Sequence, residues 1–115
     1  MIVPVLQPLD LGTSIECGQV FQWRRHGPWF CGVLSGQILH LRKIDEGIEI
    51  EGGPADADVL CDIAKKFLRC DDPLTEIYRS IASDPYIRDA TERHWGLRIL
   101  RQSPWDCLLS FACSV

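Results

Sequence analysis

The chain has 115 residues, a formal net charge of −4 at pH 7, 46% hydrophobic residues and 24% charged residues. This length fits one domain, and the composition is typical of a folded globular protein rather than a disordered one. No apolar run approaches the roughly 20 residues that cross a bilayer, and the first residues lack the basic start of a signal peptide. We therefore expect a soluble, intracellular protein.

Alternation of apolar and polar residues predicts β-strands throughout the first half of the chain, at 19–24, 29–34, 37–42 and 48–51. In the strand at 37–42, Leu39 and Leu41 share one face and Ile38 and His40 share the other. Turns are expected at 25–28, at Ser35-Gly36 and at 45–47. The pattern indicates an antiparallel meander with one buried face.

Helical spacing replaces alternation after Gly52-Gly53-Pro54, where apolar residues recur from Val59 to Leu68. Three further helices are predicted from a cap residue followed by proline, at Asp72-Pro73, Asp84-Pro85 and Ser103-Pro104. The fold class expected is α+β, with an antiparallel sheet of four to six strands packed by helices. The last helix is apolar on nearly all sides up to Val115, so we interpret the chain as a piece of a longer protein in which that helix is buried.

The acidic balance weighs against this chain binding DNA by itself, because phosphate contacts depend on clustered Lys and Arg. The basic pairs at 24–25, 42–43 and 65–66 are interpreted as solvated surface. Six cysteines without a Cys-x-x-Cys pair favour reduced, buried thiols, with a disulfide framework or a zinc site as alternatives. No metal site is predicted, and His26, His40 and His94 are given structural or surface roles.

Two stretches resemble the 8-oxoguanine DNA glycosylase family. The first is Leu9-Asp10-Leu11 followed by Cys17-Gly18-Gln19-Val20-Phe21-Gln22-Trp23, and the second is the block from Leu97 to Ser114, with its Leu-Arg-Gln-x-Pro and Cys-Leu-x-Ser-Phe phrases. The order between them also matches, so the resemblance covers nearly the whole chain. Gln22 departs from the family pattern, which often has Arg there. The resemblance implies a sheet domain similar to the repeat of TATA-binding protein at 1–96, and the start of a helix-hairpin-helix domain at 97–115.

The family flips the damaged guanine out of the duplex and attacks its sugar with a lysine, assisted by an aspartate. Both residues match positions beyond Val115, and Lys43, Lys65 and Lys66 match neither, so the resemblance implies that this chain alone is inactive. It implies no cofactor and no metal. The expected partners are damaged double-stranded DNA and the helix-hairpin-helix domain, without a membrane. The expected location is the cytoplasm, near the nucleoid in a prokaryote, or the nucleus in a eukaryote.

Two residues carry expected substrate contacts. By resemblance, the backbone carbonyl of Gly18 accepts a hydrogen bond from the N7 proton of the lesion; the alternative is that Gly18 eases the start of a strand. Phe111 matches a residue near the pocket wall, although core packing is the alternative. The aromatic pairs of the first half are expected in the core rather than stacked on bases: Phe21/Trp23 and Trp29/Phe30.

Two other functions stay open at this point. One is the matching domain of an alkylated-base glycosylase, which shares the architecture. The other is a free-standing binding or scaffold module whose acidic surface suggests protein partners. The sequence leaves the oligomeric state undecided.

Overall fold

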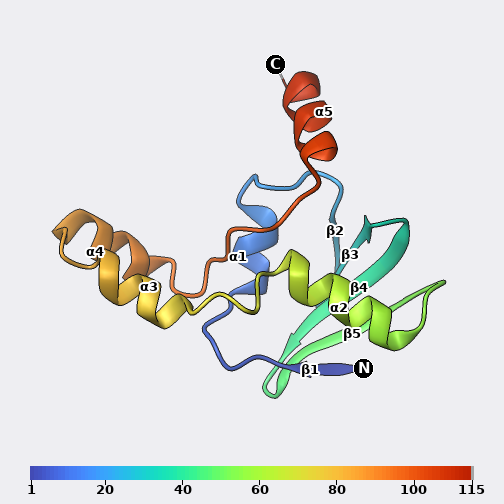
Figure 1. Ribbon diagram of the computed structural model, residues 1–115, viewed down its shortest axis with the longest axis horizontal. Helices are drawn as coiled ribbons and strands as arrows, with labels where there is room; N and C mark the ends of the chain where they lie inside the picture. The colour runs from blue at the N-terminus through green and yellow to red at the C-terminus, as the bar shows by residue number, and fades with distance from the viewer. Residues whose placement is uncertain (115) are drawn as a thin grey trace.

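The computed structural model describes residues 1–114, and Val115, expected as part of the last helix, lies outside the described residues. One five-stranded antiparallel sheet has the order β1-β5-β4-β3-β2; α2 lies over it, α3 and α4 lie to one side, and α5 projects away from it (Figure 1). The strands are β1 (Ile2–Pro4), β2 (Arg24–His26), β3 (Trp29–Leu34), β4 (Gln37–Ile44) and β5 (Gly47–Gly53). The helices are α1 (Leu11–Glu16), α2 (Ala57–Phe67), α3 (Leu74–Ile81), α4 (Pro85–Arg93) and α5 (Pro104–Ser114). The predicted α+β class is confirmed.

The sheet has one buried face, as its alternation predicts. Direct cross-strand partners place Phe30, Leu41 and Ile50 in one row of that face, and Leu41 is fully buried. Helix α2 covers this face by packing against β4 and β5 (Figure 1). It buries Leu60, Cys61, Ala64 and Phe67. Val59, expected on the same face, is instead 48% exposed, because helical periodicity places it outside the stripe formed by the buried residues.

Helices α3 and α4 form a hairpin to one side of the sheet (Figure 1). The side chain of Asp84 accepts hydrogen bonds from the amides of Tyr86 and Ile87, so the predicted cap of α4 is confirmed. The equivalent prediction for Asp72 is wrong: α3 begins at Leu74, Pro73 holds the cap position, and no side chain caps the helix.

The segment between 17 and 26 differs most from the prediction. Strand β2 is only Arg24–His26, and the residues expected to begin it form turns and bends. Phe21 is 60% exposed rather than in the core. Trp23 stacks on Phe67 of α2 with ring centroids 5.1 Å apart. Phe21 and Trp23 therefore alternate in the sequence without belonging to a strand: Trp23 packs on Phe67, and Phe21 lies exposed in a loop.

The cysteines also depart from expectation. Only Cys61 is buried, Cys31 and Cys70 are partly exposed, and the other three are exposed, all six being free thiols. Burial raises the pKa of the Cys61 and Cys70 thiols above the ordinary value. Residues 1–114 contain no cluster of His, Cys, Asp or Glu suited to a metal ion.

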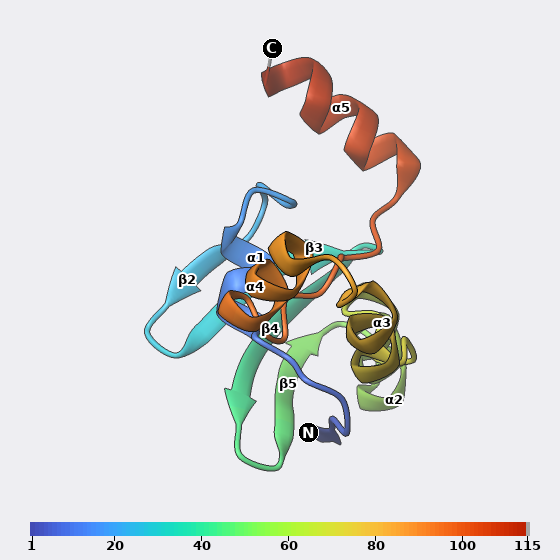
Figure 2. The same cartoon turned by 90° about the vertical axis from the view of Figure 1, so that its left-hand side faces the viewer.

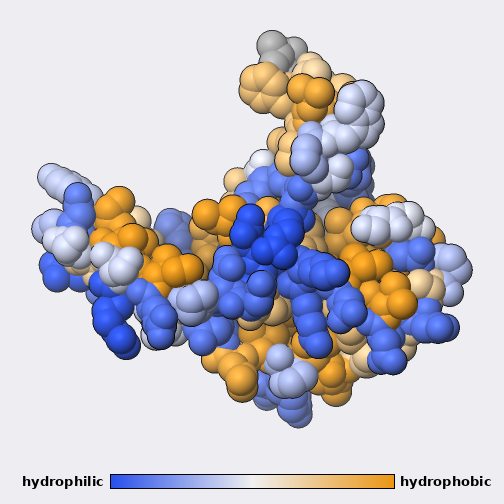
Figure 3. Space-filling view, in the orientation of Figure 1, coloured by the Kyte–Doolittle hydropathy of each residue, from blue (hydrophilic) through white to orange (hydrophobic). Residues whose placement is uncertain are grey.

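Helix α5 stands clear of the rest of the chain and buries none of its described residues (Figure 2). It carries several hydrophobic side chains above the body of the molecule (Figure 3). Over the described part of the chain, no helix combines the length and apolar character needed to cross a membrane.

Candidate functional site

Gly18 lies in the turn that follows α1, six residues before β2 begins, and so not at the start of a strand. Its φ is +98°, a conformation that side-chain-bearing residues rarely adopt, and no heavy atom lies within 4 Å of the position a Cβ would occupy. Within residues 1–114, no group donates a hydrogen bond to its carbonyl oxygen. The turn therefore presents an accessible and unpaired backbone acceptor.

Gln19 fixes this turn against a distant part of the chain. Its Nε2 donates to the carbonyl of Arg98 at 2.7 Å and to that of Ser14 at 3.2 Å, while its Oε1 accepts from the amide of Leu100 at 2.9 Å. Gln102 donates in return to the Gln19 carbonyl at 2.8 Å. One side-chain amide of the first stretch that carries the family resemblance thus satisfies backbone groups of the second stretch and of α1. The sequence indicated both stretches but gave no sign that Gln19 joins them.

A second set of contacts holds the same segment against the beginning of α1. The amide of Arg98 donates to Ser14 Oγ at 2.9 Å, and the fully buried Ser14 hydroxyl donates to the carbonyl of Asp10 at 2.6 Å. The Asp10 amide donates to the carbonyl of Gly96 at 2.8 Å. Gly96 has φ +90°, and a Cβ there would lie 2.6 Å from the Asp10 nitrogen. Only glycine allows this close approach.

The Arg98 side chain, 1% exposed, completes the junction. Its Nε donates to the Pro8 carbonyl at 3.0 Å, and one terminal nitrogen donates to the carbonyls of Arg69 at 2.8 Å and Asp72 at 3.4 Å. The other terminal nitrogen has no partner among the described residues. The guanidinium lies at the C-terminal end of α2, where carbonyl dipoles favour a cation. By hydrogen bonds to their backbones it therefore joins two separate segments, the one before α1 and the turn between α2 and α3, to its own.

Phe111 lies on α5 and is 70% exposed, so no core of residues 1–114 contains it. A shallow hollow of about 400 Å³ separates α5 from the loop that follows Gly18. It is lined by Phe21 and Gln22 of the loop and by Leu109, Ser110, Cys113 and Ser114 of α5. The structure thus brings the Gly18 loop and α5 to a common hollow, although it records no contact between Gly18 and Phe111.

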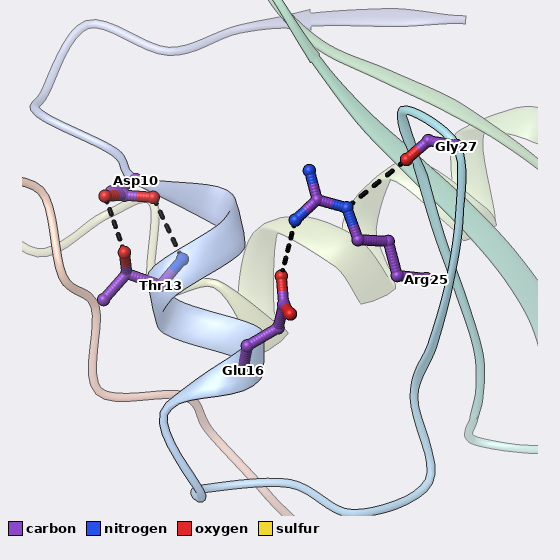
Figure 4. Close-up of polar contacts among 5 residues, drawn as sticks. All are labelled: Asp10, Thr13, Glu16, Arg25 and Gly27. Atoms are coloured by element: carbon purple, nitrogen blue, oxygen red, sulfur yellow. Dashed lines mark hydrogen bonds and ion pairs between the residues drawn. The ribbon is translucent and has the colours of Figure 1, made fainter.

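Polar and charged side chains around α1 satisfy one another by hydrogen bonds (Figure 4). The Asp10 carboxylate accepts from the Thr13 amide at 3.0 Å and from its hydroxyl at 2.8 Å. Arg25 donates to Glu16 at 2.9 Å and to the Gly27 carbonyl at 3.4 Å. These exposed contacts bring together both signs of charge, so this side of the molecule is not a basic patch. Lys43, Lys65 and Lys66 are also exposed.

Comparison with known proteins gives a consistent result. The family model described as 8-oxoguanine DNA glycosylase, N-terminal domain, matches residues 2–108. The N-glycosylase/DNA lyase OGG1 of Arabidopsis thaliana is 27% identical over 115 residues, which cover 92% of this chain and 30% of the relative. The N-glycosylase/DNA lyase of Saccharomyces cerevisiae is 28% identical over 120 residues, covering 92% and 31%. The chain therefore spans about a third of the length of these relatives.

Solved structures agree in fold. The protein MBOgg1, in complex with a low affinity DNA ligand, superposes with a TM-score of 0.88 at 25% identity, covering 98% of this chain and 39% of that one. The apo form of the Clostridium acetobutylicum 8-oxoguanine glycosylase/lyase gives 0.87 at 26% identity, with the same coverage. The same enzyme, in complex with double-stranded DNA containing cytosine opposite 8-oxoG, gives 0.83 at 24% identity, covering 100% and 42%.

Proposed function

Because the chain belongs to the family of 8-oxoguanine DNA glycosylase N-terminal domains, we propose that it forms part of the lesion pocket of a glycosylase and AP lyase that removes 8-oxoguanine from double-stranded DNA. The matched relatives are N-glycosylase/DNA lyases, which supports an enzymatic parent protein. The matching family is that of the oxidised-guanine enzymes, which favours 8-oxoguanine over alkylated bases as the substrate.

The observation that carries this proposal is the position of Gln19. Its contacts hold the Gly18 turn against residues 98–100, just before α5 begins. We propose that the unpaired Gly18 carbonyl accepts the N7 proton of 8-oxoguanine, a donor that guanine lacks. A buried acceptor left without a donor costs about 1–3 kcal/mol. Binding of an undamaged base would carry that penalty.

Helix α5 supplies the second part of the proposal. Trp105, Leu108, Leu109 and Phe111 are each at least 45% exposed, a degree of apolar exposure that marks an interaction surface. We propose that the helix-hairpin-helix domain of the parent protein packs on α5, and that Phe111 then forms part of the pocket wall. Double-stranded DNA would bind to the combined surface, and not to this acidic domain alone.

Catalysis is assigned to residues outside this chain. We expect the 115-residue chain neither to release 8-oxoguanine from duplex DNA nor to form a borohydride-trapped adduct, because each of its three lysines is exposed and none has been desolvated into a nucleophile. Excision and trapping assays, with the Clostridium acetobutylicum enzyme as positive control, measure this. A stoichiometric adduct on Lys43, Lys65 or Lys66 would contradict the assignment.

The contact to the lesion is tested in a chimera in which this chain replaces the matched part of the Clostridium acetobutylicum enzyme. Gly18→Ala should lower kcat/KM for 8-oxoguanine about tenfold more than for an excised lesion without the N7 proton, the equivalent of one lost buried hydrogen bond. Gly27→Ala is the matched control, because Gly27 also has a positive φ, +58°, and open space around its Cβ position. Equal losses on the two lesions would remove Gly18 from lesion recognition.

A further inference from the structure

The outer face of the sheet, opposite α2, carries a row of four chemically complementary side chains. Strand register pairs Arg24 with Cys31, Cys31 with His40, and His40 with Glu51. Direct partners in antiparallel strands project from the same face. The row therefore crosses β2, β3, β4 and β5 in the order cation, thiol, imidazole, carboxylate, and we call it the outer-face row.

The two central members are in contact. Cys31 Sγ lies 2.9 Å from His40 Nδ1. Both residues are partly exposed, and their neighbours in the next row, Val33 and Ile38, are 53% and 54% exposed. Small molecules in solvent can therefore reach the thiol. Cys17, Cys107 and Cys113 are more exposed, but no histidine contact is recorded for them among residues 1–114.

We propose that His40 acts as the general base for Cys31, which makes Cys31 a covalent modification site for soft electrophiles of the α,β-unsaturated carbonyl class. The imidazole takes the thiol proton at Nδ1, because this atom faces the sulfur. Arg24 is the direct cross-strand partner of Cys31, where negative charge develops, and Glu51 is that of His40, where positive charge develops. Both charges therefore have a neighbour of opposite sign, the arrangement that favours reactive cysteines.

The remaining charged groups on this face do not disturb the pair. Arg42 and Glu49 form their own ion pair in the adjacent row, where the Arg42 guanidinium also lies 4.7 Å from the centroid of the Trp29 ring. His26 is the direct partner of Trp29 at the end of β2. Helix α2 packs on the opposite face of the sheet and contributes no charge here.

The reaction is an addition and needs no oxidant. The thiolate electron pair forms a bond to the β-carbon of the electrophile, and the π electrons of the carbon–carbon double bond move toward the carbonyl as an enolate. The proton held by His40 returns, through water, to the α-carbon. The product is a thioether, the imidazole is neutral again, and no group is released.

The test uses the 115-residue chain and acrylamide at pH 7, with adducts on each cysteine quantified over time by peptide mass spectrometry. A thiol without an adjacent base reacts slowly at this pH, so Cys31, with His40 to take its proton, should react about tenfold or more faster than the more exposed Cys107. His40→Asn should bring the Cys31 rate down to that of Cys107. His94→Asn, which changes the exposed histidine after α4, should leave it unchanged.

Two controls keep the result interpretable. Buried Cys61 should stay slow in every variant that is folded, because burial raises its pKa and shields it from the reagent. If His40→Asn exposes Cys61, then Glu51→Gln, which removes only the charge beside the imidazole, should still slow Cys31 by severalfold. A Cys31 rate no greater than that of Cys107, or one that neither His40→Asn nor Glu51→Gln lowers, would overturn the proposal. The outcome is independent of the proposed glycosylase function, since Cys31, His40 and Glu51 all lie outside the Gly18 turn and α5.

Discussion

Gln19 shows how one uncharged side chain can organise a site without touching a substrate. Its amide group pairs with a donor and two acceptors of the backbone, at Leu100, Arg98 and Ser14. Such groups are costly to leave unpaired once they are shielded from water. The same contacts hold the residue after Gly18 against residues 98–100, so stability and the geometry of the turn depend on the same residue.

We expect Gln19→Leu to lower the free energy of unfolding by about 2–3 kcal/mol, because leucine fills a similar volume while the Leu100 amide and the Arg98 carbonyl lose their partner. Urea unfolding of the 115-residue chain measures the change. Gln22→Leu is the matched control: Gln22 is exposed in the same loop, and its replacement should change stability by less than about 0.5 kcal/mol. Equal effects of the two substitutions would show that the Gln19 contacts contribute little.

At the scale of elements, the sequence predicted those helices and strands whose formation depends on neighbouring residues. The meander from β3 to β5 and the cap of α4 followed from alternation, from turn residues and from Asp84-Pro85. Helix α1 was missed because it has only six residues and its Asp10 cap stood in a stretch without helical periodicity. The short strand β1 was missed for the same lack of length. Asp72-Pro73 shows the limit of a local signal, since the same dipeptide as in α4 does not cap α3.

The two sequence stretches that form the candidate site were predictable, but the contacts that bring them together were not. The phrase at Gly18 and the block at 97–114 were visible in the sequence, whereas the contacts that join them span about 80 positions, as from Gln19 to Leu100. The pair of Cys31 and His40 was equally hidden, because it depends on the register of β3 and β4. Tertiary contacts of this kind leave no periodic trace in a single sequence.

Helix α4 provides the element-scale prediction. It buries no residue and depends on its cap, on Pro85 at its first turn and on contacts with α3. We expect Asp84→Ala to destabilise the helix by about 1 kcal/mol, and so to raise the hydrogen-exchange rates of the α4 amides severalfold while those of α2 stay unchanged. Asp56→Ala is the control, because Asp56 precedes α2 without a side-chain cap bond. Unchanged exchange in α4 would show that the cap is dispensable.

At the scale of the whole molecule, the sheet domain needs a C-terminal boundary. The family resemblance places this boundary after residue 96, and this stays a prediction. In the structure, Leu100 belongs to the hydrophobic core and the Arg101 amide donates to the Phe67 carbonyl at 2.8 Å. Helix α5 by contrast buries nothing within the described residues. These contacts favour a folding unit that extends to residue 103, with α5 outside its core.

Two shortened chains distinguish these boundaries. A chain of residues 1–103 should unfold with a free energy within about 1 kcal/mol of that of the full 115 residues, because α5 contributes exposed surface and no core. A chain of residues 1–96 loses the buried Leu100 side chain, for which removal of a core leucine alone costs about 2–5 kcal/mol. It also loses the partners of Gln19 and Ser14, so it should be less stable by at least that amount or fail to fold. Urea unfolding and far-ultraviolet circular dichroism measure both chains. If residues 1–96 proved as stable as residues 1–103, the segment before α5 would belong to the helical domain, and the Gly18 turn would be held in place only when that domain is present.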